Sequence, residues 1–270
     1  MSDLLKRSFA PIVGSAWDEI DTQAKRVLKG NLSARTLVDF NGPHGWTLSA
    51  VNLGKVTINQ KEGSLPGVAW GKREVLPLIE FRVPFKLNIE ELDNLERGLK
   101  TPDLDPLDEA GRKAALFEER AIYYGLKKAG IDGILSSSPH KPIDLPGDPE
   151  NYQEIIEAGI VTIQKSGIGG PYYLVLGSLP YQLLQQGDKR GYPLFKRVKD
   201  MLRGDILWSP AIEGGALISG RGGDYEMTVG QDLSIGYLNH DTAQVELFIT
   251  ESFTFQVLEP AAALEFKLKG

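Results

Sequence analysis

The segment that most limits the folds open to this chain is residues 245–257, close to the C-terminal end of the sequence. Apolar and polar side chains alternate along it with two exceptions, which predicts a β-strand with one buried and one solvated face. An extended segment of this length spans roughly 43 Å, more than the strands of compact domains usually do. The strand therefore favours a broad, flat subunit that tiles with copies of itself.

An amphipathic helix is predicted near the start of the chain, over residues 15–29. Ser15 can serve as its N-cap, and Gly30 is a stop signal. The apolar side chains that share one face are Trp17, Ile20, Ala24, Val27 and Leu28. This face either packs on the core of its own subunit or leaves part of a groove open for a partner, and the pattern alone favours the former.

Residues 46–87 consist of strand patterns separated by turn residues, which is typical of a long hairpin arm. A two-stranded hairpin is marginally stable alone in water, so we expect the arm to lie on its own domain or on a neighbouring subunit. A linker rich in Pro and Asp then leads into a long helix at 107–129, which we expect to pack on the C-terminal strand. Glu118 and Glu119 on this helix are predicted to be solvent-exposed.

The proline-rich residues 131–151 mark the passage into a second domain. The pattern of this domain indicates an α/β unit. The predicted helices are 152–165, 179–186 and 194–202, and the predicted strands are 172–176, 205–209 and 216–219. Residues 187–192, between the last two helices, are too charged to be buried and are predicted to form an exposed loop.

The composition excludes several classes of partner. The chain of 270 residues has a formal net charge of -6 and no basic stripe to hold phosphates, so we expect no nucleic-acid partner. No apolar run approaches the ~20 residues that a membrane helix needs, and residues 1–7 lack the apolar stretch of a signal peptide. We therefore expect a cytoplasmic protein with no membrane partner. Without cysteine there is no disulfide, thiolate metal site or cysteine nucleophile.

The sequence predicts neither a catalytic nor a metal site. The histidines His44, His140 and His240 lie far apart in turn-like settings, and none has the spacing of a metal ligand pair. The glycine-rich residues 166–171 follow a predicted helix and precede a predicted strand, which is the reverse of the order in a dinucleotide site. No candidate serine lies in a Gly-x-Ser-x-Gly elbow. We therefore expect no enzyme, no metal and no cofactor.

Short blocks of residues, spread over nearly the whole chain, occur in the order found in a known family. These blocks are residues 6–11 (KRSFAP), 42–46 (GPHGW), 70–71 (WG), 76–80 (LPLIE), 91–98 (ELDNLERG), 221–224 (RGGD), 230–237 (GQDLSIGY) and 248–257 (FITESFTFQV). Through them the chain resembles the encapsulins, bacterial and archaeal shell proteins that themselves resemble the major capsid protein of tailed phages.

The resemblance implies an α+β fold of the tailed-phage major capsid type, also known as the Hong Kong phage type. Such a fold has a peripheral domain, an extended arm loop, and an axial domain that meets its copies at the symmetry axes. On this chain the peripheral domain would comprise residues 1–45, 88–130 and 220–270. The arm loop would then be residues 46–87, and the axial domain residues 131–219.

The resemblance also implies a function. Identical subunits would assemble into a closed icosahedral nanocompartment around a separate cargo enzyme, often a ferritin-like iron-storage protein or a dye-decolourising peroxidase. A C-terminal peptide of the cargo would dock between the N-terminal helix and the peripheral domain, which favours the open groove for that helix. The cargo-peptide site would comprise Ile20, Ala24, Val27, Leu28, Arg35, Asp39, Asp232, Leu233, Ile235 and Tyr237.

The predicted exposed loop corresponds to the loop at the five-fold axis of the family. Its residues are Gly187, Asp188, Lys189, Arg190, Gly191 and Tyr192. Rings of its charged side chains would select the ions that enter the shell. Two other functions stay open. One is a phage major capsid protein, which would package DNA. The other is a peptidase or bacteriocin-like enzyme, for which the sequence offers no nucleophile, base and orienting partner.

Overall fold

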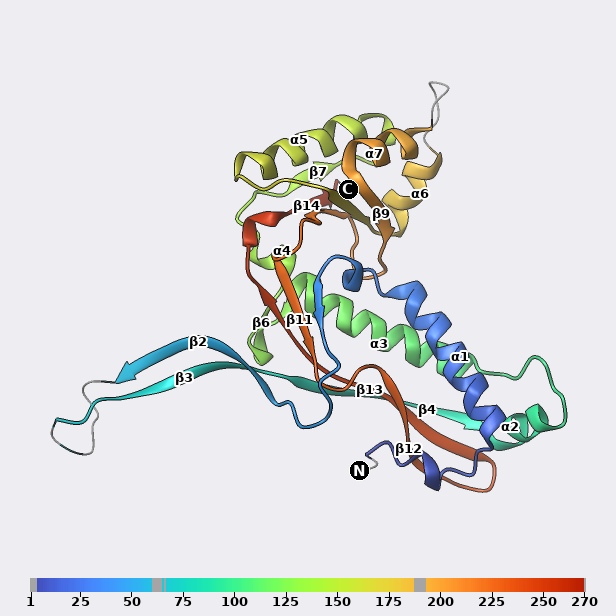
Figure 1. The fold of residues 1–270 in the computed structure, drawn as a ribbon. Coiled ribbons are helices and arrows are strands. Elements are labelled where there is room, and N and C mark those ends of the chain that lie inside the picture. The colour runs from blue at the N-terminus through green and yellow to red at the C-terminus, as the bar shows by residue number, and fades with distance from the viewer. Residues whose placement is uncertain (1–3, 60–64, 66, 187–192, 270) are drawn as a thin grey trace.

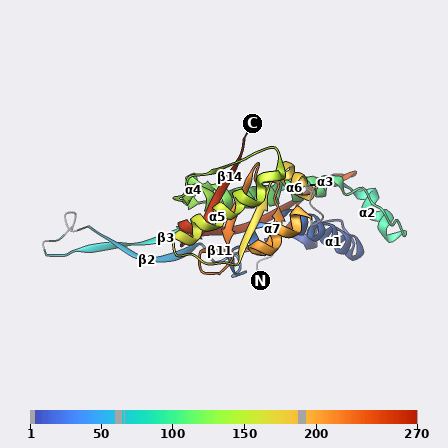
Figure 2. The same ribbon diagram turned by 90° about the horizontal axis from the view of Figure 1, so that it is seen from above.

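The computed structural model describes residues 4–59, 65, 67–186 and 193–269. Its strands form two five-stranded sheets, with helices packed on them, and a small two-stranded sheet. A long two-stranded arm projects from one side of a flat body (Figures 1 and 2). The fold is therefore of the mixed α+β class that the sequence predicts.

The predicted C-terminal strand is β13 (Gln244–Val257), the central strand of a five-stranded sheet, termed the lower sheet. β4 (Ile79–Asn88) pairs with one edge of β13 along most of its length. On the other edge β13 pairs first with β12 (Ser234–His240) and then with β11 (Tyr225–Val229), and β1 (Asp39–Asn41) lies beyond β11. The longest strand thus holds together segments from both ends of the chain.

The prediction that β13 has a solvated face is wrong, because the middle of the strand is buried on both faces. Leu247 and Phe255 point into the core as the alternation predicts. On the other face, Thr250 donates a hydrogen bond to the carbonyl oxygen of Phe81, and Ser252 accepts one from the backbone N–H of Gln231. Short hydroxyl side chains can be buried when neighbouring backbone groups satisfy them, and such residues look solvated in a sequence pattern.

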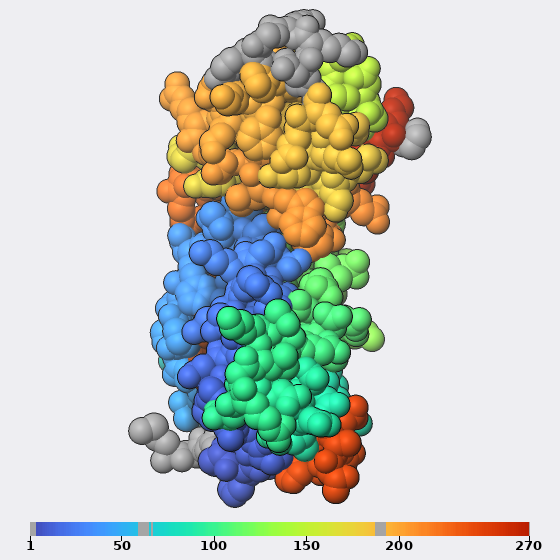
Figure 3. Space-filling view, turned by 90° about the vertical axis from the view of Figure 1, so that its right-hand side faces the viewer, coloured from blue at the N-terminus to red at the C-terminus, as the bar shows by residue number. Residues whose placement is uncertain are grey.

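Helices α1 (Gly14–Asn31) and α3 (Asp105–Tyr124) pack against each other beside the lower sheet. The short helix α2 (Ile89–Glu96) lies at the N-terminal end of α1 (Figure 3). Gly111 lets the helices approach, since a Cβ built there would lie 3.0 Å from Cγ1 of Val27. The remaining short elements of this region are the 3-10 turns η1 (Arg7–Phe9) and η2 (Ala34–Thr36).

Two boundaries of these helices differ from the prediction. Ser15 is not the N-cap of α1: Val13 takes that position, and the hydroxyl of Ser15 donates to the carboxylate of Glu96 instead. Helix α3 ends at Tyr124 and not at residue 129, because the chain turns at Gly125 with φ 84° and ψ 168°. This backbone conformation is almost restricted to glycine. The chain continues through β5 (Gly125–Leu126), η3 (Lys127–Ala129), β6 (Ile131–Asp132) and α4 (Ile134–Ser137).

The arm is shorter than the sequence indicated. It consists of β2 (Ala50–Asn59) and β3 (Trp70–Pro77), which pair only with each other among the described residues. Residues 79–87, predicted to be part of the arm, belong to β4 and pair with β13 in the lower sheet. Both strand types alternate in the same way, so the pattern alone does not reveal where the arm joins the body.

The second sheet, termed the upper sheet, forms the α/β unit predicted from the sequence. Helices α5 (Tyr152–Lys165) and α7 (Leu194–Leu202) and strand β8 (Tyr172–Leu176) have the predicted bounds, and α6 (Ser178–Gln186) begins one residue earlier. The predicted loop at 187–192 lies outside the described residues. The upper sheet is completed by β9 (Arg203–Trp208), β10 (Gly215–Ser219) and β7 (Ile143–Leu145), with η4 (Pro149–Asn151) before α5.

One further strand of the upper sheet comes from the last part of the chain. After η5 (Pro260–Ala262), β14 (Ala263–Leu268) pairs antiparallel with β10 and parallel with β7. The family resemblance implied that this segment belongs to the peripheral domain, which contains the lower sheet. The chain thus passes from one sheet to the other a second time. One buried core cluster includes residues of both sheets, and a second one lies between α1, α3 and the lower sheet.

Candidate functional site

A groove lies between helix α1 and strand β12, with a volume of about 220 Å³. Ala24 and Leu28 line it from α1, one helical turn apart. On the other side it is lined by Leu233, just before β12, and by Ile235 on β12. The full set of lining residues is Leu5, Arg7, Asp21, Ala24, Lys25, Leu28, Leu233, Ser234, Ile235 and Ile249. The groove therefore has an apolar floor that two separate elements build.

Charged side chains lie at the rim of the groove. Arg7, Asp21 and Lys25 are on the side of α1, and Arg7 Nη2 lies 2.9 Å from Asp21 Oδ2. Outside the lining of the groove, farther along β12, the hydroxyl of Tyr237 lies 2.6 Å from Nδ1 of His240. The groove is smaller than the ~300 Å³ at which pockets for drug-sized ligands begin. Its size and alternating walls suit single apolar side chains of an extended peptide better than a cofactor.

Arg35 lies next to the groove, at the centre of a partly buried cluster of carboxylates. Its Nε and Nη2 donate to the two oxygens of Glu118 at 2.8 and 2.7 Å, and Nη2 also donates to Glu251 at 2.7 Å. Its Nη1 donates to Asp232 at 3.0 Å. Burial by itself would lower the pKa of Arg35, but the hydrogen bonds and charge of Glu118 outweigh it, so this pKa is raised and the guanidinium stays charged.

Glu251 is fully buried beside this cation. Burial, and next the negative charge of Glu118, raise the pKa of Glu251 well above its ordinary range. Its second carboxyl oxygen, Oε2, is buried and has no hydrogen-bond partner among the described residues, which costs less in a neutral carboxyl group than in a carboxylate. A neutral Glu251 reduces the negative charge that Arg35 has to balance, which makes the cluster compatible with its burial.

The neighbouring carboxylate of Glu119 joins three parts of the chain. It accepts hydrogen bonds from the backbone N–H of Ala34 and from the hydroxyls of Ser33 and Ser209, at 2.7, 2.5 and 2.7 Å. Burial raises its pKa from 4.5 to about 7, although these hydrogen bonds act in the opposite direction. Glu118 and Glu119 are both fully buried, so the prediction that they are solvent-exposed is wrong. Their partners come from distant segments, which a local sequence pattern does not contain.

The structure brings together some of the residues assigned to the cargo-peptide site and separates others. Those that line the groove are Ala24, Leu28, Leu233 and Ile235. Asp232 accepts a hydrogen bond from the backbone N–H of Leu233 and binds Arg35, and the backbone N–H of Tyr237 donates to the carbonyl oxygen of Leu5. Ile20 is fully buried in the core below the groove.

Two of the assigned residues lie elsewhere. Val27 packs toward Gly111 on α3 and so faces the helix pair instead of the groove. Asp39 is on β1 and accepts a hydrogen bond from the backbone N–H of Gly223 at 2.7 Å. Val27 is adjacent in sequence to the lining residue Leu28, but its position on the helix turns it toward α3. Asp39 follows Arg35 closely in sequence, but it lies on β1, where its side chain binds the backbone of Gly223.

The sequence reading missed several lining residues, namely Leu5, Arg7, Asp21, Lys25, Ser234 and Ile249. Asp21 and Lys25 lie on α1 at helical spacing from Ala24 and Leu28, so the helical period could have indicated them. Leu5 and Arg7 belong to the N-terminal segment, which has no periodic pattern. Their position depends on contacts with α1 and β12 that only the folded structure shows.

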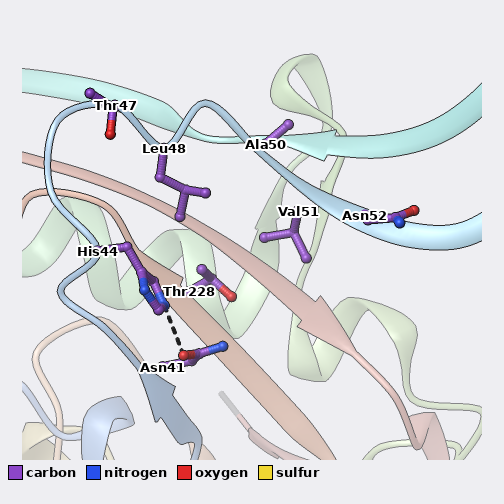
Figure 4. A pocket seen from close by; sticks show the side chains of 8 residues that line it. All are labelled: Asn41, His44, Thr47, Leu48, Ala50, Val51, Asn52 and Thr228. Atoms are coloured by element: carbon purple, nitrogen blue, oxygen red, sulfur yellow. Dashed lines mark hydrogen bonds between the residues drawn. The ribbon is translucent and has the colours of Figure 1, made fainter.

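A second hollow, of about 420 Å³, lies where the arm joins the body (Figure 4). Its lining comes from β1, the segment after it, β2 and β11: Asn41, His44, Thr47, Leu48, Ala50, Val51, Asn52 and Thr228. His44 Nε2 lies 2.8 Å from Oδ1 of Asn41, and the side chains that line this hollow include no carboxylate.

No group of metal-ligating side chains occurs among the described residues. His140 Nε2 contacts the carbonyl oxygen of Ala261 at 2.9 Å, and His44 and His240 have the partners given above. In the part of the chain with described positions, no helix is both long and apolar enough to cross a bilayer.

Comparison with known proteins assigns the chain to a family. Residues 1–254 match the profile of a family described as "Encapsulating protein for peroxidase". Proteins named "Type 1 encapsulin shell protein" are similar over nearly their full length. That of Rhodospirillum rubrum is 42% identical and the alignment covers 99% of this chain and 97% of the relative. That of Brevibacterium linens is 38% identical, with 98% and 99% covered.

Solved structures with much lower identity share the fold. A virus-like particle from Pyrococcus furiosus gives a TM-score of 0.63 at 18% identity, covering 92% of this chain and 98% of that one. The Gordonia phage Cozz gives 0.55 at 12% identity, covering 89% and 87%. The fold is thus that of the tailed-phage major capsid proteins. Since the profile and the full-length relatives agree, this chain belongs to the encapsulin family of shell proteins.

Proposed function

We propose that copies of this chain assemble into a closed icosahedral shell around a separate cargo enzyme, and that a C-terminal peptide of the cargo binds the groove between α1 and β12. The observation that carries the proposal is the groove itself, an apolar channel with charged rims in a subunit of a shell-protein family. The description of the family makes a peroxidase the first candidate cargo. A ferritin-like protein is the second.

The arm supports the assembly part of the proposal. Val56 and Ile58 on β2 and Trp70 on β3 are 53%, 62% and 44% exposed in the isolated subunit. Apolar side chains on a projecting hairpin are stabilised when a neighbouring subunit covers them. We therefore propose that the arm lies on an adjacent copy in the shell.

Assembly is tested by expressing the chain alone and imaging the purified material by electron microscopy. We expect closed, hollow particles that contain protein and no nucleic acid. A single 29.7 kDa species in physiological buffer would contradict the proposal. Such particles are expected to show no peptidase activity of their own once cargo is removed.

The groove is tested by co-expression with a fluorescent reporter that ends in the C-terminal peptide of a peroxidase from the same genome, and with a second reporter carrying that of a ferritin-like protein. Leu28→Asp, which places a charge on the apolar floor, is expected to reduce reporter loading at least tenfold while particles still form. The matched control is Lys29→Asp, at an exposed neighbouring position of α1. Equal loading in both variants would contradict the assignment of the groove.

We also propose that residues 187–192 contribute charged rings at the five-fold symmetry axis, as the family resemblance implies. The flanking helices α6 and α7 pack on each other, with the rings of Tyr181 and Phe195 6.3 Å apart. Replacing Asp188, Lys189 and Arg190 with neutral residues is expected to change the rate of ion entry into loaded particles. An unchanged rate would remove this role.

The proposed compartment lies in the cytoplasm, where a chain without cysteine folds with no need of an oxidising environment. The shell subunit has no catalytic role in this proposal, and the chemistry belongs to the cargo. The relatives, which are named as shell proteins, support that division.

A further inference from the structure

The N-terminal segment, residues 4–9, already lies over the groove. The carbonyl oxygen of Leu5 accepts a hydrogen bond from the backbone N–H of Tyr237 on β12, at 2.7 Å, and the side chain of Leu5 lines the groove. Tyr237 belongs to the strand whose opposite edge is paired with β13. Residue Leu5 therefore contacts β12 in the way that an extended peptide does when it adds to the edge of a sheet.

Arg7 fastens this segment to α1. Its guanidinium lies 3.9 Å from the ring centroid of Trp17 and 2.9 Å from the carboxylate of Asp21, both on α1. Two apolar side chains of the segment are largely outside the groove, because Leu4 is 44% and Phe9 is 70% exposed. Exposed ion pairs and cation–π contacts each contribute little to stability, so a competing ligand can displace the segment.

We propose that residues 4–9 are an intramolecular occupant of the groove, a strap that the cargo peptide displaces when it binds. The inference rests on the proposed function, because it takes the groove to be the cargo-peptide site. An intramolecular occupant competes at a high effective concentration and so lowers the apparent affinity for cargo. The strap thus favours peptides whose apolar side chains fit the groove better than Leu5 does.

The proposal predicts that the strap sequence is itself a ligand of the groove. The test uses a fluorescent reporter that ends in residues 4–11 of this chain (LLKRSFAP), co-expressed with the full-length shell chain. The tag keeps its own Arg7, whereas the shell chain is either unchanged or carries Arg7→Ala. Loosening the strap in the shell is expected to raise loading of the tagged reporter roughly threefold to tenfold.

Two controls make the loading result specific. A tag carrying Leu5→Asp is expected to load no better than the untagged reporter, because the charged side chain does not fit the apolar floor. Lys29→Ala in the shell, an exposed change on the same helix, is expected to leave loading unchanged. Loading of the tagged reporter that stays equal or falls with Arg7→Ala overturns the proposal.

Hydrogen exchange on assembled particles provides a second measurement. Arg7→Ala is expected to speed exchange of the Tyr237 amide, whose acceptor is Leu5, while the amides in the middle of β13 stay protected. Unchanged exchange at Tyr237 would also overturn the strap. The reporter with a peroxidase peptide separates the two ideas. If this reporter loads equally into unchanged and Arg7→Ala shells, the groove binds cargo peptides but the strap does not compete with them. If it loads into neither shell, the proposed function itself fails.

Discussion

Glu119 on α3 accepts a hydrogen bond of 2.7 Å from the hydroxyl of Ser209, which follows the last residue of β9 in the upper sheet. The same carboxylate also binds Ser33 and Ala34 at the end of the α1 region. A single buried carboxyl group thus connects three parts of the fold: the end of a strand in the upper sheet, helix α3, and the segment that follows α1.

The raised pKa of Glu119 predicts that stability depends on pH. The folded protein holds this proton up to a pH of about 7, whereas the unfolded chain releases it near 4.5. The stabilisation is therefore complete below pH 4.5 and is lost as the pH rises through 7, a change of roughly 3 kcal/mol in the free energy of unfolding. Glu119→Gln is expected to flatten this part of the pH profile.

Urea unfolding at a series of pH values and a fixed subunit concentration measures this effect. Glu109→Gln is the control, because Glu109 is exposed on the same helix. Equal slopes of stability against pH in the wild type and Glu119→Gln would show that Glu119 does not hold the proton.

Arg35 predicts a non-additive pair of substitutions. Arg35→Gln leaves Glu118 buried without its cation and is expected to cost about 3–5 kcal/mol of unfolding free energy. Adding Glu118→Gln removes the uncompensated charge, so the double variant should be more stable than Arg35→Gln alone. Denaturation of the two single variants and the double variant gives the coupling energy. Additive effects would mean that the two side chains do not act as a pair.

The exposed apolar face of the arm predicts an assembly defect. Val56→Lys combined with Ile58→Lys is expected to give soluble subunits or partial particles in place of closed shells, because charged side chains oppose burial against a neighbour. Size-exclusion chromatography and electron microscopy detect the change. Val56→Leu combined with Ile58→Leu, which keeps both side chains apolar, is the control. Normal shells from the double variant would exclude burial of this face between subunits.

Two glycines near the end of α3 form a matched pair. Gly130 has φ 74° and ψ 15°, and a Cβ there meets only Leu76 at 3.9 Å, so Gly130→Ala is expected to cost about 1 kcal/mol. A Cβ on Gly125 would lie 2.7 Å from the backbone of Gly133 and Ile131, so Gly125→Ala is expected to cost at least about 3 kcal/mol. Thermal unfolding compares them, and equal losses would argue against the clash.

The sequence predicted those elements whose own residues determine them. Helix 152–165 and strand 172–176 have the predicted bounds because each has a clear period and ends at turn residues. The extent of the arm was overestimated because β4 alternates like β2, and its pairing of Ile79 with Phe253 depends on a strand far along the chain. The position of β14 in the upper sheet likewise depends on its partners β7 and β10.

Some residues of the candidate site could be predicted from the family resemblance, and others depend on the tertiary fold. The family resemblance indicated Leu28 and Ile235, which the fold does place on opposite walls of one groove. Helical geometry turns Val27 toward α3, although it is adjacent to Leu28. The buried carboxylates and the strap could not be predicted, since Glu119 needs Ser209 and Leu5 needs Tyr237, and these pairs are joined only by the tertiary fold.

The arm makes a newly synthesised subunit prone to misassociation before it assembles. β2 and β3 pair only with each other among the described residues, so each presents one edge to which no further strand is paired. Such edges can recruit strands of other chains in the wrong register and start aggregation. Lys55, Lys72 and Arg73 place positive charge along these strands, which repels a second identical edge. Rapid capture by a correct neighbour therefore protects the subunit from its own hairpin, and slow assembly exposes it to misassociation.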